Sequence, residues 1–143
     1  GILGTSSGLH FDVTPNCNVQ VRGKKHFVLF APSEARNLYR VHNGAHCRFD
    51  PNLPDYEACP VARRAPGMRC TLEEGECIYI PAGWFHQVTV VSPWSVNVNF
   101  FWRRPFPQGL ATPALWHLLL RRAWAKVATA LRPASREGRR PDR

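Results

Sequence analysis

The sequence has no long apolar run and no leader segment at its start. No apolar stretch approaches the ~18 residues that a membrane-spanning helix needs, so the sequence predicts no membrane partner. The chain begins at Gly1 rather than Met, without the basic and apolar regions of a signal peptide. We therefore expect no secretory signal, and we expect further residues upstream of Gly1.

The sequence lacks paired cysteine spacings. The chain has 5 cysteines, an odd number, and no C-x-x-C pair. A disulfide framework or a structural zinc site would show paired spacings. We therefore predict free thiols in a reducing compartment, cytoplasmic or nuclear.

Acidic residues are few at the end of the chain. The 143 residues, about one domain's worth, carry a net charge of +9. Residues 1–109 hold 11 Lys and Arg against 8 Asp and Glu, whereas residues 110–143 hold 8 against 2. This basic tail permits contact with nucleic acid, although a solubilising role is the commoner explanation for such a tail.

Short alternating segments separated by turns predict a mainly β domain over residues 1–109. The turn at 22–25 separates two strands of a hairpin, and the segment 34–39 favours a short helix. Four prolines make 40–68 a long connection, which is often functional. In the last strand Asn97 and Asn99 share one face and Val96, Val98 and Phe100 the other, so the asparagines face something polar. The expected strands are 17–21, 26–30, 68–72, 77–80, 87–91 and 94–102, a pattern typical of a barrel or sandwich.

The sequence predicts an amphipathic C-terminal helix over residues 110–132 and a disordered basic tail over residues 133–143. So much apolar surface is expected to be covered, either by the domain's own sheet or by the same helix in a homodimer. The apolar positions at helical spacing are Leu115, Trp116, Leu119, Leu120, Ala123, Trp124, Val127 and Leu131.

Two constellations carry possible chemistry. His10 and Asp12 are two apart, so on a strand they face the same way. His86 opens a strand after a glycine turn, an apolar strand and a Pro-x-Gly turn at 75–83. Each signal alone is weak, because such residues are often merely hydrogen-bonded. Together, two histidines and one carboxylate match the facial triad of non-haem iron(II) oxygenases.

The motifs around these residues resemble the Jumonji-C (JmjC) domain of the cupin superfamily. G-T-S-S-G-L-H-F-D at 4–12, V-Q-V-R-G-K-K-H-F-V-L-F-A-P at 19–32 and G-E-C-I-Y-I-P-A-G-W-F-H at 75–86 occur in the family's order, followed by S-V-N-V-N-F-F-W at 95–102. The resemblance covers roughly residues 2–104. It implies a double-stranded β-helix of the cupin or jelly-roll type, and a further N-terminal segment that family members carry.

The resemblance also implies which residues bind a metal ion and a co-substrate. Fe(II) would be bound by His10, Asp12 and His86. The co-substrate 2-oxoglutarate would be held by Lys25, fifteen residues after the first histidine, although Lys24 beside it shows how easily a lysine arises in such a turn. Three further residues would complete the pocket: Ser7 and Asn16 meet the family's offsets, and Asn99 faces inward with Asn97 as its competitor.

The leading functional hypothesis is an Fe(II)- and 2-oxoglutarate-dependent oxygenase. Its substrate would be a protein side chain or a modified tRNA base, and N-demethylation is the same chemistry on a methyl group. One alternative is a non-oxygenase metal cupin, which usually has H-x-H where this chain has His10-Phe11-Asp12. Another is a non-catalytic JmjC-like scaffold that binds a partner.

Overall fold

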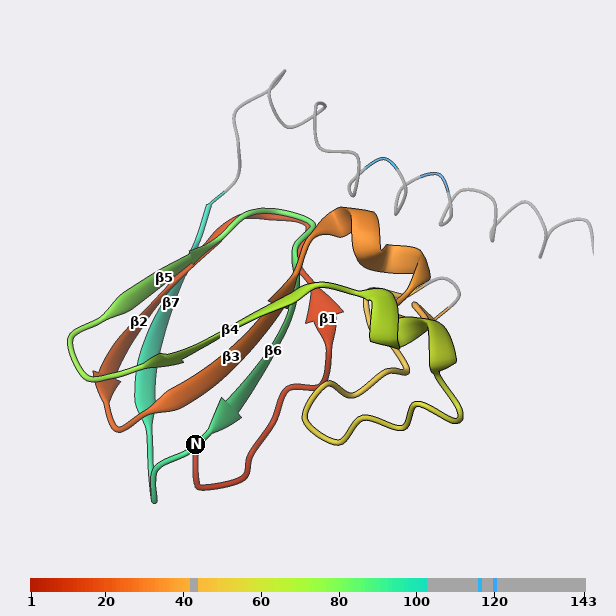
Figure 1. Cartoon of the computed structure of the whole chain (residues 1–143). Helices are drawn as coiled ribbons and strands as arrows, with labels where there is room; N and C mark the ends of the chain where they lie inside the picture. Colours follow the sequence, from red (N-terminus) through yellow and green to blue (C-terminus); the bar gives the residue numbers. More distant parts are fainter. Residues whose placement is uncertain (42–43, 103–115, 117–119, 121–143) are drawn as a thin grey trace, which may run out of the picture.

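The computed structural model describes residues 1–41 and 44–102, together with Trp116 and Leu120 (Figure 1). No helix within these residues is long and apolar enough to cross a membrane. Two short 3-10 helices, η1 (Pro32–Arg36) and η2 (Pro60–Arg64), lie in the connection between β3 and β4. The strands are β1 (His10–Phe11), β2 (Asn16–Arg22), β3 (Lys25–Phe30), β4 (Gly67–Leu72), β5 (Cys77–Ile80), β6 (Phe85–Val90) and β7 (Val96–Phe101).

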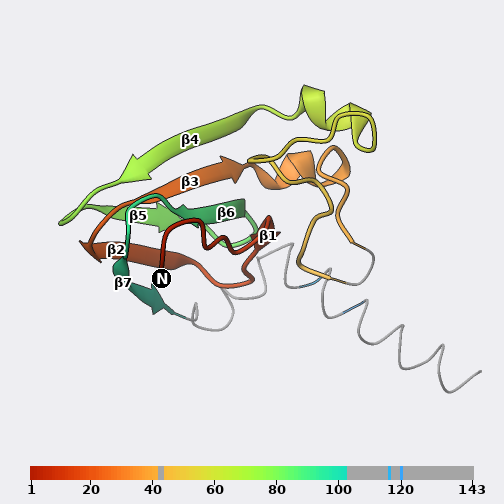
Figure 2. The same ribbon diagram turned by 90° about the horizontal axis from the view of Figure 1, so that it is seen from below.

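The strands form two antiparallel sheets that face each other (Figures 1 and 2). One sheet has the order β1-β6-β3-β4 and the other the order β5-β2-β7. Each of the pairs β2 and β3, β4 and β5, and β6 and β7 is consecutive in the chain but divided between the two sheets. The chain therefore winds back and forth between the sheets, which confirms the predicted mainly β architecture of the cupin type.

The connection from β3 to β4 differs from its prediction. In place of a helix over 34–39 the chain forms the five-residue η1, and Tyr39 then adopts a left-handed backbone with φ of 52°. A non-glycine residue in this region cannot continue a right-handed helix. Leu38, which is fully buried, fixes this turn against the sheet.

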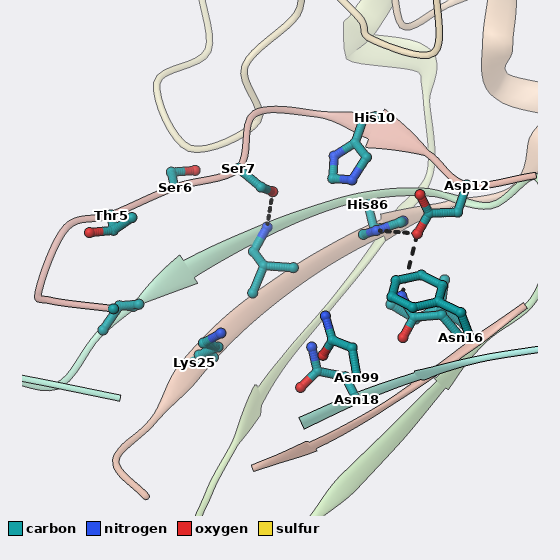
Figure 3. Close-up of a pocket in the computed structure, with 15 residues that line it drawn as sticks. Thr5, Ser6, Ser7, His10, Asp12, Asn16, Asn18, Lys25, His86 and Asn99 are labelled. Carbon is teal, nitrogen blue, oxygen red and sulfur yellow. Dashed lines mark hydrogen bonds and ion pairs between the residues drawn. The ribbon is translucent and has the colours of Figure 1, made fainter. Parts of the chain in front are cut away.

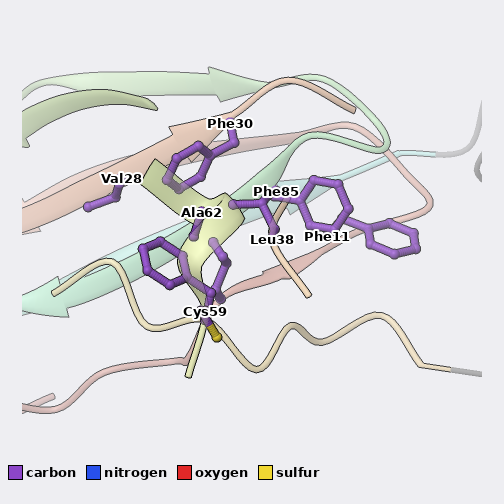
Figure 4. Packing of buried hydrophobic residues seen from close by; sticks show 9 residues of the cluster. Phe11, Val28, Phe30, Leu38, Cys59, Ala62 and Phe85 are labelled. Carbon is purple, nitrogen blue, oxygen red and sulfur yellow. The ribbon is translucent and has the colours of Figure 1, made fainter. Parts of the chain in front are cut away.

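Along each strand, side chains point alternately into the space between the two sheets and to the outer face of their own sheet. On β3, Phe27 and Leu29 point inward and pack with Leu72 and Ile80 in the inner cluster. Val28 and Phe30 point outward instead, into a second cluster beneath the connection that carries η1 and η2 (Figure 4). The larger apolar core therefore lies outside the barrel, which leaves part of the interior free for polar side chains.

Phe27 is the largest fully buried side chain of the inner cluster, and Phe27→Ala is expected to lower the free energy of unfolding by about 3–5 kcal/mol. The loss reflects the removed apolar surface and the cavity left behind. Val21→Ala, at a largely exposed position on β2, should change it by less than about 0.5 kcal/mol. Urea unfolding followed by circular dichroism measures both, and equal effects would contradict this core assignment.

The predicted C-terminal helix over 110–132 and the tail over 133–143 lie outside the described residues, apart from Trp116 and Leu120. Both of these have helical backbone, and both side chains are largely exposed. The helix as a whole, the boundary at 109, the homodimer and the contact of the tail with nucleic acid stay predictions.

Candidate active site

A cavity of about 320 Å³ opens between the two sheets. Its walls come from both sheets and from the segment that precedes β1. The segment from Gly4 to Ser7 runs beside β6, held by backbone hydrogen bonds to Val88 and Val90. The structure brings every predicted site residue to this cavity: Ser7, His10, Asp12, Asn16, Lys25, His86 and Asn99 all line it (Figure 3).

His10, Asp12 and His86 form the only cluster of three potential metal ligands among the described residues. One ligand atom from each lies within 4.8 Å of the other two. His10 and His86 are directly opposite each other in the β1–β6 pair, with ring centroids 4.4 Å apart. The Asp12 carboxylate lies 3.7 Å from His86 Nε2. Three neighbouring donors of this kind leave other positions on a bound ion open, as a facial triad does.

Backbone contacts hold the three side chains in place. His10 Nδ1 lies 3.0 Å from the Gly8 carbonyl, and His86 Nδ1 lies 3.2 Å from the Trp84 carbonyl. A carbonyl only accepts, so each Nδ1 carries the proton and each Nε2 keeps its lone pair for a metal. The backbone N–H of Gly83, in the turn before β6, donates to the Asp12 carbonyl at 2.8 Å. The Pro-x-Gly turn thus ties the two halves of the triad together.

His86 is biased towards its neutral form. Burial lowers the pKa of His86, and the neighbouring His10 lowers it further, against the opposing effects of the Trp84 carbonyl and Asp12. A neutral imidazole is the form that binds a metal. The buried ligand is therefore ready to coordinate at neutral pH.

The lowered pKa of His86 predicts how the stability of the metal-free chain depends on pH. As the pH is lowered, His86 takes up a proton in the unfolded chain at the ordinary histidine pKa of about 6.5. In the folded chain His86 takes up its proton only at a lower pH. The contribution of His86 to the free energy of unfolding should therefore be pH-independent well above pH 6.5, and it should lower that free energy as the pH falls below about 6.5. Urea unfolding across this range checks the expectation. His86→Gln should flatten this part of the profile, and a profile unchanged by His86→Gln would contradict the expectation.

Lys25 lies in the cavity, apart from the triad (Figure 3). It is the only lysine or arginine among the described residues that line it. Burial lowers the pKa of Lys25, and its Nζ donates a hydrogen bond to Asn97 Oδ1. Lys24 instead points to solvent, where it pairs with Glu73 at 2.8 Å. The structure thus places Lys25, the lysine that the sequence analysis favoured, in the cavity and Lys24 on the surface.

The two asparagines of β7 also separate. Asn99 lines the cavity, whereas Asn97 does not; it bonds both Lys25 and, at 2.6 Å, Asn99. The predicted polar face of β7 is therefore correct. Its opposite face, with Val96, Val98 and Phe100, is about half exposed.

Sequence reasoning missed Asn18. It is buried, lines the cavity between Asn16 and Asn99, and its side-chain oxygen has no hydrogen-bond partner; the same holds for the oxygen of Asn16. Buried amides without partners are costly unless something binds them. The alternation of Asn16, Asn18 and Gln20 along β2 carried the same signal as the alternation on β7.

These residues fit a metal together with a small keto acid that carries a second carboxylate. The triad offers nitrogen and oxygen donors of the type that non-haem iron takes. Lys25 offers a partly buried cation to a distal carboxylate, which needs a charged partner when it leaves water. The side-chain oxygens of Asn16 and Asn18, which have no partner, offer hydrogen-bond acceptors to a bound molecule.

Comparison with known proteins is consistent with this geometry. Residues 1–108 match the family model described as a cupin-like domain. The chain belongs to the cupin-like domain family. The matched range contains the whole cavity, including all three residues of the triad.

Curated proteins that are similar to this chain include a Jumonji C domain-containing protein 5 of Drosophila melanogaster, 34% identical over 106 residues, across 71% of this chain and 26% of that protein. The chain is 39% identical over 94 residues to the tRNA wybutosine-synthesizing protein 5 of Danio rerio, across 66% of this chain and 28% of that protein. It is 35% identical over 105 residues to the lysine-specific demethylase JMJ30 of Arabidopsis thaliana, across 71% of this chain and 24% of that protein. The chain thus spans about a quarter of the length of each of these relatives.

A solved structure of Drosophila melanogaster CENP-C bound to CAL1 is also similar, with a TM-score of 0.46 and 10% identity over 71% of this chain and 56% of that one.

Proposed function

We propose that this cupin-like domain is the catalytic core of an Fe(II)- and 2-oxoglutarate-dependent oxygenase that hydroxylates a protein side chain or a modified nucleoside. The observation that carries the proposal is that the cluster of His10, Asp12 and His86 lines the same cavity as Lys25. Names of relatives, one tRNA-modifying and one lysine-demethylating, support the same class.

Each part of the cavity has a separate task. His10, Asp12 and His86 hold Fe(II), and Lys25 binds the distal carboxylate of 2-oxoglutarate, fixed in position by its bond to Asn97. Ser7, Asn16 and Asn99 complete the polar wall around the co-substrate. Bound iron and 2-oxoglutarate supply the activation of O₂ that such a protein needs to hydroxylate a C–H bond.

Hydroxylation and demethylation differ only in the carbon that is attacked. Oxygen inserted into a methyl group on nitrogen gives a product that releases formaldehyde, whereas oxygen inserted elsewhere remains in the product. The residues of the cavity serve both outcomes.

The test incubates the protein with Fe(II), 2-oxoglutarate and pools of cellular peptides or tRNA, followed by mass spectrometry. The expected result is a product that gains one oxygen atom, or loses a methyl group with release of formaldehyde, with matching formation of succinate. A protein that binds a partner but forms neither product nor succinate would instead be the non-catalytic scaffold. Metal-dependent turnover without consumption of 2-oxoglutarate would identify the non-oxygenase cupin.

We also propose that the protein works in the cytoplasm or nucleus. All five cysteines lie within the described residues, and all are free thiols.

A further inference from the structure

A third histidine, His46, lies beside the cluster of candidate metal ligands without being part of it. His46 forms a β-bridge with His10 on the side away from β6, and the two ring centroids are 5.4 Å apart. Directly opposed residues of antiparallel strands point to the same face, so His46, His10 and His86 form a row on one face of the sheet. His46 is therefore adjacent to a candidate ligand of the metal.

His46 is placed to contact something other than the metal or the co-substrate. Its ring nitrogens do not belong to the three-ligand cluster, and it does not line the cavity that contains Lys25. The residue is exposed. One side of its ring is turned to His10, and the rest is accessible to a molecule that approaches the metal from solvent.

The chain segment that contains His46 is basic and is flanked by Glu34 and Asp50. The chain from 35 to 49 contains three arginines and no Asp or Glu. Arg36 and Arg48 are exposed, and no carboxylate of the described residues forms a salt bridge with either. The acidic turn with Glu73 and Glu74 belongs to the β4–β5 connection, where it pairs with Lys24 and Arg22.

This charge distribution discriminates between substrate classes. A protein substrate presenting a lysine would bring a cation to a segment whose exposed charged side chains are the arginines Arg36 and Arg48. The partly exposed carboxylate of Asp12 belongs to the candidate metal cluster, so a bound metal would engage it. A nucleic acid brings phosphates, which arginine binds well, and planar bases, which stack on histidine rings. An exposed imidazole one ring away from the metal is a suitable platform for a base displaced from its neighbours.

We propose that His46 stacks on the substrate base of an RNA and that Arg48 binds a phosphate beside it. The assignment rests on the proposed oxygenase function of the neighbouring triad. It makes His46 a substrate-specificity residue that neither binds the metal nor takes part in proton transfer.

The test uses the full chain loaded with Mn(II) and compares two fluorescent RNA stem-loops by anisotropy. The two RNAs are identical except that one carries a purine and the other an abasic site at the same loop position. Because both have the same phosphates, the ratio of their affinities reports stacking and is insensitive to the basic C-terminal tail. We expect the purine RNA to bind about tenfold more tightly, in the range that base stacking on aromatic side chains provides.

Four variants assign the effect. His46→Ala should bring the affinity ratio close to one, whereas His46→Phe, which retains a flat ring, should preserve it. Arg48→Ala should weaken both RNAs equally and reduce the salt dependence by about one phosphate contact. Arg22→Ala, at the end of β2, is the matched arginine control and should leave both affinities nearly unchanged.

A ratio that His46→Ala leaves unchanged would overturn the proposal, as would tighter, His46-dependent binding of a lysine-containing peptide. Stoichiometric Mn(II) binding, measured in the same samples, separates this failure from failure of the proposed function. Normal metal binding with an unaffected ratio contradicts only the role of His46, whereas absence of metal binding in the unaltered chain contradicts the oxygenase itself.

Discussion

Asp12→Ala should abolish stoichiometric binding of Fe(II) or Mn(II) while the domain stays folded. Asp12 is the only carboxylate in the cluster, and without it two neutral imidazoles would have to hold a divalent cation alone. Loss of a mere outer contact to a metal ligand costs about 10–100-fold in affinity, and loss of the ligand itself should cost more. Equilibrium dialysis with metal analysis measures the effect.

The fold should survive this change because Asp12 is anchored through its backbone. Its carbonyl accepts from the N–H of Gly83, a bond that alanine retains. The Asp12 side chain is partly exposed. Among the described residues, its carboxylate accepts a single hydrogen bond, a long one of 3.4 Å from Asn16 Nδ2. Asp55→Ala, at a turn-capping aspartate in the β3–β4 connection, is the matched control and should bind metal normally. Unchanged metal affinity in Asp12→Ala would refute the triad.

Lys25→Ala should raise the 2-oxoglutarate concentration needed for half-saturation at least about tenfold. A hydrogen bond to a charged group contributes about 1.5–3 kcal/mol, and Lys25 is the only lysine or arginine among the described residues lining the cavity. The same variant should lose much of its preference for 2-oxoglutarate over keto acids that lack the second carboxylate. Binding titrations with both types of keto acid measure these effects.

Lys24→Ala is the matched control for Lys25. The two lysines are adjacent, but Lys24 is paired with Glu73 on the surface, and exposed pairs of this kind contribute little to stability. Lys24→Ala should therefore leave the requirement for 2-oxoglutarate unchanged. The opposite outcome, with Lys24 important and Lys25 not, would mean that the register of the β2–β3 hairpin is wrong by one residue.

The site could be predicted largely because its residues follow strand periodicity. His10 and Asp12 are two apart, Lys25 opens a strand, and Asn99 alternates with valine and phenylalanine on β7. Such patterns state which side chains share a face, and the family resemblance supplied what those faces bind. Applied to β2, the same alternation would have added Asn18.

Residues that depend on long-range pairing could not be predicted. His46 lies beside the candidate metal ligands only because its irregular segment pairs with β1. No spacing in the sequence predicts that β-bridge. The main apolar cluster likewise combines β1, β3 and β6 with a connection that has no regular pattern. Alternation shows that Val28 and Phe30 face away from Lys25, but it does not show that a long connection covers them.

The apolar outer face of β7 runs against the usual alternation of half-buried strands. Ordinarily apolar side chains face the interior and polar ones face solvent. Here Asn97 contacts Lys25 and Asn99 lines the open cavity while remaining exposed, and Val98 and Phe100 on the other face are about half exposed. Knowing only the sequence, one can identify the two faces of this strand but not which of them is covered.

The measurement that tests the central claim most directly is an anaerobic titration of the Fe(II)-loaded chain with 2-oxoglutarate, followed by visible absorption. Bidentate binding of the keto acid to iron produces a charge-transfer band that neither component has alone. We predict a band that saturates at one 2-oxoglutarate per iron in the unaltered chain and is absent in His86→Ala. A folded, Fe(II)-bound chain that develops no band at saturating 2-oxoglutarate would contradict the account.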